Sequence, residues 1–84
     1  MQITYHTDSG HGWLQTSNSL IAELGIEDKI SSYSYKDFTA VYLEEDMDAG
    51  TFIDALKKRD PNIELTFNEK FQENSFIRSL PSYQ

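Results

Sequence analysis

Alternating apolar and polar residues at the start of the chain predict a β-hairpin. Residues 2–6 alternate in type, which places Ile3 and Tyr5 on one face of an extended segment. Residues 7–12 contain Asp, Ser and two Gly, the residue types that favour a tight turn. Residues 13–16 can then pair back on the first strand, so the chain is expected to open with two adjacent antiparallel strands.

A short helix is predicted directly after this hairpin. Ser17 can act as its N-cap, because a serine hydroxyl accepts hydrogen bonds from the free amides of the first turn. Gly25 is placed to adopt the left-handed conformation that commonly ends a helix. Three apolar residues between these caps share one helical stripe: Leu20, Ile21 and Leu24. Ile26 and Ile30 follow in a short connector and are expected to pack inward.

The middle of the chain predicts a second hairpin and a longer helix. Residues 32–36 and 39–44 have strand character, and the residues between them suit a tight turn. Asp48 is predicted to be the N-cap of the helix, and Pro61 prevents its continuation. The apolar residues of this helix recur at intervals of three and four positions: Ala49, Phe52, Ile53 and Leu56.

The last third of the chain predicts one more strand, over residues 63–67, where apolar and polar residues alternate again, and Phe71 could extend this strand. Residues 75–84 are predicted to form either an edge strand or an ordered tail. The element order is therefore ββα–ββα–β, in a single domain over residues 1–84. This order predicts a small α+β domain with a mainly antiparallel sheet and two helices packed on it.

Composition and charge narrow the classes of partner. The chain has 14 acidic and 7 basic residues and a net charge of −7, so direct binding of nucleic acid is not expected. It contains no cysteine, which excludes a disulfide, a thiol nucleophile and a cysteine zinc site. No apolar run approaches the length of a membrane span, and the N-terminus lacks the features of a secretory signal. We therefore expect no membrane partner and a cytoplasmic protein; a homo-oligomer stays open, because a small domain can gain buried surface by association.

His6, Asp8 and His11 form the one group that resembles a chemical site. Two imidazoles and a carboxylate across a glycine-containing turn could bind a divalent metal ion such as zinc, nickel or iron(II). The same residues also suit a purely structural turn, with Asp8 bonded to its own backbone, and this interpretation is favoured. The histidines could also titrate near neutral pH as a proton switch. No nucleophile motif, phosphate-binding loop or dinucleotide motif is present, so an enzyme is not expected.

Four carboxylates lie close together at the junction between the second hairpin and the second helix: Glu44, Glu45, Asp46 and Asp48. The helix dipole and the need for surface charge explain acidic residues at this position without any partner. The functional alternative is a surface that attracts a basic protein, including one that normally holds nucleic acid. The spacing of Asp46, Asp48 and Gly50 does not match a calcium-binding loop.

Tyr33, Tyr35 and Tyr42 allow two interpretations. Tyrosines on one sheet face can form a recognition patch, because tyrosine is favoured in binding surfaces. They can equally belong to the core, with their rings under the helices and their hydroxyl groups at the edge. The core interpretation is favoured.

Three separated segments carry a family resemblance. They are HTDSGHGWL at residues 6–14, LGIEDKIS followed by YSY over residues 24–35, and VYLEED with a further Asp at residues 41–48. In this order they resemble a family of small proteins of bacteriophages and other bacterial mobile elements, over about residues 5–56. The resemblance implies action in the cytosol of a bacterial host and an accessory or host-interaction role, but no catalytic or binding residue.

The expected function is accordingly that of a non-enzymatic acidic interaction protein of phage or mobile-element origin. Its partner would be a basic host or phage protein, bound at the four clustered carboxylates, and the domain could act as a nucleic-acid mimic or inhibitor. A small metal-binding protein that uses the histidine turn is one alternative. A minor phage structural or assembly protein is another.

Overall fold

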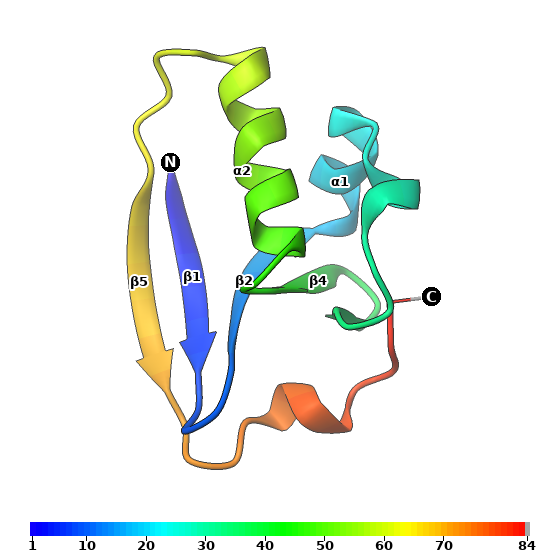
Figure 1. Ribbon diagram of the computed structural model, residues 1–84, viewed down its shortest axis with the longest axis vertical. Coiled ribbons are helices and arrows are strands. Elements are labelled where there is room, and N and C mark those ends of the chain that lie inside the picture. The colour runs from blue at the N-terminus through cyan, green and yellow to red at the C-terminus, as the bar shows by residue number, and fades with distance from the viewer. Residues whose placement is uncertain (84) are drawn as a thin grey trace.

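A five-stranded sheet with two helices forms the body of the molecule (Figure 1). The structure is a computed structural model that describes residues 1–83. Its elements, in chain order, are β1 (Gln2–Thr7), β2 (Gly12–Ser17), α1 (Asn18–Leu24), η1 (Glu27–Lys29), β3 (Tyr35–Lys36), β4 (Ala40–Glu44), α2 (Asp48–Arg59), β5 (Thr66–Phe71) and η2 (Phe76–Ser79), where η1 and η2 are 3-10 helices. This order confirms the predicted small α+β domain of type ββα–ββα–β.

The strands lie in the order β3-β4-β2-β1-β5. β1 with β2, β2 with β4 and β3 with β4 are antiparallel pairs, whereas β5 runs parallel to β1. Tyr5 of β1 therefore lies opposite Leu14 of β2 on one side and beside Glu69 of β5 on the other side. The last strand of the sequence is therefore the neighbour of the first, at one edge of the sheet (Figure 1).

The helices cover one sheet face and create the main core there. This core consists of Ile3, Leu14, Ile21, Ile26, Ile30, Val41, Leu43, Ala49, Phe52 and Leu56. Burial of Ile26 and Ile30 confirms the prediction that the connector packs inward. Alternation along β1, β2 and β4 sends the intervening side chains to the opposite face.

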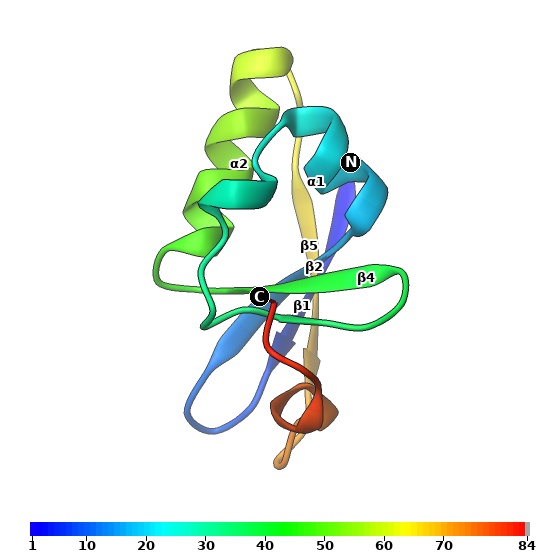
Figure 2. The ribbon, with the colours of Figure 1, turned by 90° about the vertical axis from the view of Figure 1, so that its right-hand side faces the viewer.

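The opposite face carries a second, smaller core under the C-terminal segment. Trp13, Ala40, Tyr42 and Ile77 form it, and Leu80 packs against it. Residues 75–83 are an ordered tail that contains η2 and returns toward β4 (Figure 2). Residue 84 of the predicted tail lies outside the described residues.

The favoured interpretation of the three tyrosines is wrong in its location. Tyr42 is buried, but it lies under the C-terminal segment rather than under the helices. Tyr35 is half-buried beside it, and Tyr33 is 76% exposed. The reason is that Tyr35 and Tyr42 are paired across β3 and β4, so both side chains project from the same face, away from α1 and α2.

The predicted caps of the first helix are confirmed. The Ser17 side chain accepts a hydrogen bond from the amide of Leu20, and Gly25 has a φ of 68°, in the left-handed region. The predicted cap of the second helix is wrong. α2 begins at Asp48 itself, and the Glu44 carboxylate, rather than Asp48, accepts from the free amides at this end.

Two predicted strands are displaced. β3 contains only residues 35–36 of the predicted 32–36, because the backbone before it forms a turn in which the amide of Ser34 donates to the carbonyl of Ser31. β5 covers 66–71, so the extension to Phe71 is confirmed, but the predicted start at residue 63 is wrong. Ile63 and Leu65 pack against the core before the strand begins, and pairing with β1 starts at Thr66.

Candidate protein-binding face

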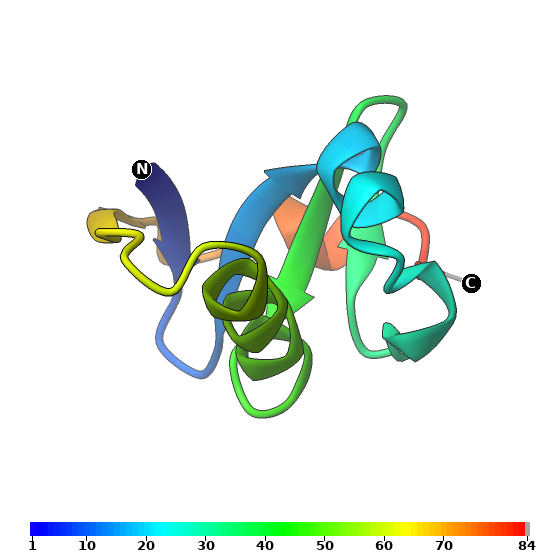
Figure 3. The same cartoon turned by 90° about the horizontal axis from the view of Figure 1, so that it is seen from above.

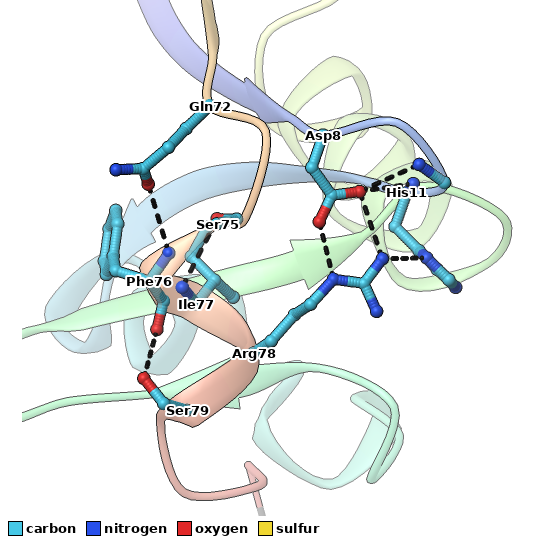
Figure 4. Close-up of polar contacts among 9 residues, drawn as sticks. Asp8, His11, Gln72, Ser75, Phe76, Ile77, Arg78 and Ser79 are labelled. Carbon is cyan, nitrogen blue, oxygen red and sulfur yellow. Dashed lines mark hydrogen bonds and ion pairs between the residues drawn. The ribbon is translucent and has the colours of Figure 1, made fainter.

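The carboxylate of Asp8 stabilises the turn of residues 8–11. Asp8 Oδ1 accepts hydrogen bonds from the amides of Gly10, at 3.0 Å, and of His11, at 2.9 Å. Arg78 binds the same carboxylate through two nitrogens, with Nε 2.5 Å from Oδ2 and Nη2 3.0 Å from Oδ1 (Figure 4). The Asp8 side chain is only 1% exposed. The prediction that Asp8 is bonded to the backbone of its own turn is therefore confirmed.

Arg78 changes the chemistry of this turn. Its hydrogen bonds are the main reason that the pKa of Asp8 lies well below the usual range of an aspartate, and the amides of Gly10 and His11 act in the same direction. Arg78 Nη2 also lies 2.6 Å from His11 Nδ1. Sequence reasoning missed Arg78, because 70 positions separate it from Asp8 and no local pattern connects the two.

The structure does not assemble His6, Asp8 and His11 into the predicted metal-ligand set. His6 Nε2 lies 2.7 Å from Gln15 Oε1, and its ring makes edge contacts with Tyr42 and Phe76. The ring of His11 instead stacks on Trp13, and the carboxylate between them is engaged by Arg78. Among residues 1–83 there is no group of three or more His, Cys, Asp or Glu side chains arranged to hold a metal ion.

Of the four clustered carboxylates, two stabilise the fold and two are exposed to solvent. Asp48 is fully buried, and its Oδ2 accepts hydrogen bonds from the amide and hydroxyl of Ser31 and from the hydroxyl of Ser34. It therefore cannot contact a partner at the surface. Its presence in the predicted partner-binding set is wrong, because these donors draw the side chain into the protein.

Glu44 is the second structural carboxylate. Its side chain accepts from the amides of Asp46, at 2.9 Å, Met47, at 2.7 Å, and Asp48, at 2.8 Å. These bonds satisfy amides that have no partner within the helix and fix the loop that leads into α2. Its charge is thus committed to this loop.

Glu45 and Asp46 remain exposed, and the fold adds Glu69 to them. The Tyr5 hydroxyl donates to Glu45 Oε1 at 3.1 Å. Burial raises the pKa of Tyr5, and the bond to Glu45 and the charges of Glu45, Glu69 and Asp46 raise it further. One carboxylate, Glu45, thus contacts the phenol, and the charges of Glu69 and Asp46 act on it from further away. Sequence reasoning missed Glu69, because only the parallel pairing of β5 with β1 places it beside Tyr5.

A shallow groove of about 400 Å³ lies at this position, and we name it the Tyr5 groove. Its lining residues come from β1, β2, the β4–α2 loop, α2 and β5: Tyr5, Leu14, Glu45, Ala49, Ile53 and Phe67. Phe67 is 50% exposed and Phe71, on the same face of β5, is 65% exposed. The groove is thus apolar at its base and has one carboxylate, Glu45, in its lining. Glu69 and Asp46 lie outside this lining but close enough for their charges to act on Tyr5, and we name the three carboxylates the acidic rim.

Gly12 makes the position of Tyr5 possible. A Cβ atom on Gly12 would lie 2.3 Å from Tyr5 Oη and 2.7 Å from Cζ of the same ring. The phenol therefore lies directly over the backbone of Gly12, and only a residue without a side chain allows such a close approach.

The acidic rim is not neutralised from within the protein. The ion pairs that the described part of the chain makes are Arg59–Glu23 and Arg78–Asp8, and neither involves the rim. A second cavity, of about 590 Å³ between α1 and α2, has charges of both signs, including Glu23, Asp54, Lys58 and Arg59. The Tyr5 groove is thus distinguished by charge of one sign around an apolar base.

Comparisons with protein-family models, with curated proteins and with solved structures find no match. No helix in the described part of the chain has the length and apolar character needed to cross a membrane. The case for a function therefore rests on the geometry of this face.

Proposed function

We propose that the protein is a non-enzymatic binding protein whose Tyr5 groove and acidic rim engage a basic protein. The observation that carries this proposal is an exposed apolar groove that has Glu45 in its lining, Glu69 beside Tyr5 in the sheet and Asp46 next along the chain, none of them in an ion pair within the described residues. Interfaces commonly combine an apolar centre, rich in aromatic residues, with a polar rim. Carboxylates at such a rim speed encounter with Lys- and Arg-rich surfaces and reject acidic ones.

The proposed site modifies the acidic surface expected from the sequence. Glu45 and Asp46 are retained, whereas Glu44 and Asp48 serve the fold and Glu69 takes their place. A partner whose basic surface normally holds nucleic acid suits this site, because exposed carboxylates can occupy the positions of phosphates. Origin in a phage or mobile element, and action in the cytosol of a bacterial host, are supported by the resemblance over residues 5–56.

Capture of partners from a bacterial lysate tests the proposal. The tagged protein is incubated with nuclease-treated lysate at low and high salt, and bound proteins are identified by mass spectrometry. We expect a basic protein that is retained at low salt and released at high salt, because rim charges are screened by salt. The double variant Glu45→Lys/Asp46→Lys should lose this protein, with its fold checked by thermal unfolding.

A matched control separates the site from net charge alone. Glu27 and Asp28 are also adjacent and exposed, but they lie in η1, outside the groove. Glu27→Lys/Asp28→Lys changes the charge by the same amount and should retain the captured protein. Equal loss in both double variants, or capture that is unaffected in both, would contradict the proposed site.

A further inference from the structure

β5 is an open edge of the sheet. It is the outermost strand, it pairs only with β1 in the part of the chain that is described, and all six of its residues are exposed. Figures 1 and 3 show no segment beyond it. A long edge strand with free backbone groups is a template for pairing with another chain, and proteins usually cover or interrupt such edges.

The opposite edge of the same sheet, at β3, is covered by the C-terminal segment of the chain. Tyr35 of β3 pairs with Ser82 of the C-terminal segment in an antiparallel bridge. The amide of Lys36 donates to the carbonyl of Pro81 at 3.0 Å, and the amide of Tyr83 donates to the carbonyl of Ser34 at 2.8 Å. The chain thus closes one edge with its own tail and leaves the other available.

The backbone orientation of β5 identifies the residues that would form new hydrogen bonds. The amide of Thr66 donates to Met1 and that of Gln72 donates to Thr7, each at 2.9 Å. Backbone groups of alternate residues point to opposite sides of a strand, so those of Phe67, Glu69 and Phe71 point away from β1. The side chains of these three residues lie on the helix-bearing face, in register with Ile3, Tyr5 and Thr7.

We propose that β5 accepts one extended segment of the basic partner as a sixth strand, and this inference rests on the proposed function. The segment has the pattern apolar–x–basic–x–apolar. Its central Lys or Arg lies opposite Glu69, on the side of β5 away from Tyr5, and its apolar residues lie opposite Phe67 and Phe71. The pattern reads the same in both directions, so it suits parallel or antiparallel addition. Backbone hydrogen bonds supply affinity in this mode, and alternate side chains supply specificity.

Charge favours a basic partner over a second copy of the chain. The antiparallel register that places Phe67 of one copy opposite Phe71 of another also places Glu69 directly opposite Glu69. Like charges in directly opposed cross-strand positions are destabilising. A basic residue at the same position instead forms an opposite-charge pair.

Peptide titration tests strand addition apart from simple charge attraction. The probe is the acetylated, amidated peptide Lys-Thr-Val-Thr-Lys-Thr-Val-Thr-Lys, and binding is followed by fluorescence anisotropy of a labelled form. Two further peptides are N-methylated, one at both Val and the central Lys and the other at the four Thr. A strand directs only one alternating set of amides toward its neighbour. We therefore expect at least a tenfold loss of affinity with one N-methylated peptide and near-parent affinity with the other.

Two controls complete the test. A peptide with Glu in place of the central Lys should bind at least threefold more weakly, and Glu69→Gln should remove this discrimination. If both N-methylated peptides bind like the parent, or the parent peptide does not bind, strand addition is overturned. The lysate capture with Glu45→Lys/Asp46→Lys is independent of these results. The proposed function therefore survives if only the peptide pattern fails, and it fails if the captured protein is insensitive to the double variant.

Discussion

At the scale of single residues, the ion pair of Asp8 with Arg78 joins the first turn of the chain to its last helical segment. The carboxylate also accepts two amides of its own turn, so all of its bonds favour the charged form. Because the pKa of Asp8 is lowered by folding, its stabilising contribution is present above the ordinary aspartate value of 3.8. The contribution is lost as pH falls below that value toward the folded pKa.

Asp8→Asn should therefore destabilise the protein in a pH-dependent way. At pH 7 we expect the melting temperature to fall by several degrees, because Arg78 loses its charged acceptor. Between pH 4 and pH 2 the difference from the wild type should shrink, since the unfolded wild-type chain binds a proton at Asp8 that the folded protein does not, which favours the unfolded state. Thermal unfolding across this range measures the effect, with Glu73→Gln, at an exposed position, as the control. A difference that stays constant with pH would contradict the assignment.

The hydrogen bonds of buried Asp48 lead to a prediction about the stability of the protein. The Ser34 hydroxyl donates to Asp48 Oδ2 at 2.5 Å and accepts from the amide of Glu44 at 3.0 Å, and the Ser34 side chain is fully buried. Ser34→Ala leaves both groups without this partner and should cost about 1–3 kcal/mol in the free energy of unfolding. Urea unfolding measures the cost. Ser32→Ala, at an exposed neighbouring position, should change stability by less than about 0.5 kcal/mol.

Gly12 links the fold to the candidate site. A methyl group at this position would overlap the Tyr5 ring, so Gly12→Ala should displace the phenol from Glu45 toward solvent. The pKa of Tyr5, raised by burial and by Glu45, should then fall toward its ordinary value of 10.0. NMR titration of ring-labelled tyrosine measures this shift. Gly50→Ala, where a Cβ meets no atom within 4 Å, should leave the Tyr5 titration unchanged.

At the scale of elements, the second sheet face is covered by the C-terminal segment and not by an α-helix. Ile77 of η2 is fully buried against Trp13 and Tyr42. Ile77→Ala should lower the free energy of unfolding by about 2–4 kcal/mol, through lost burial and a cavity. Urea unfolding measures the loss, with Phe76→Ala, at a more exposed neighbouring position, expected to cost less. A cost below about 1 kcal/mol for Ile77→Ala would show that the segment is only loosely attached.

The elements that could be predicted from sequence are those whose signal is local. Ser17 and Gly25 delimit α1 through their own backbone chemistry, and the apolar period of α2 defines its buried face. The sequence places the cap of α2 at Asp48, because every acidic residue near a helix start satisfies the same rule. Which of them turns inward depends on Ser31 and Ser34, which are distant in sequence.

The candidate site was predictable only in part, for the same physical reason. Glu45 and Asp46 are exposed as an acidic turn suggests, but Glu69 joins them through a parallel pairing that no local pattern encodes. The structure does not bring the three side chains of the metal hypothesis together, because proximity in sequence does not by itself place them at one point. Arg78, 70 positions away, engages the carboxylate between the two histidines.

At the scale of the whole molecule, the net charge of −7 is distributed over a domain that has one covered and one open sheet edge. An open edge normally favours association between copies of a chain. Here Glu69 lies at the centre of β5 and opposes the register in which the two phenylalanines of each copy would meet. The same carboxylate that attracts a basic strand therefore discourages self-pairing.

Removal of the Glu69 charge should allow the β5 edge to pair with a second copy of the chain instead of a basic strand. We expect the wild-type protein to sediment as a monomer at low salt and Glu69→Val to form a dimer, because the variant replaces a like-charge pair with an apolar one between Phe67 and Phe71. Lys70→Val adds the same apolar side chain to the same strand but on the opposite face, and it keeps Glu69. It should therefore remain monomeric in sedimentation velocity. Equal dimerisation of both variants would mean that apolar surface alone, and not the carboxylate at the centre of β5, determines which partner the edge accepts.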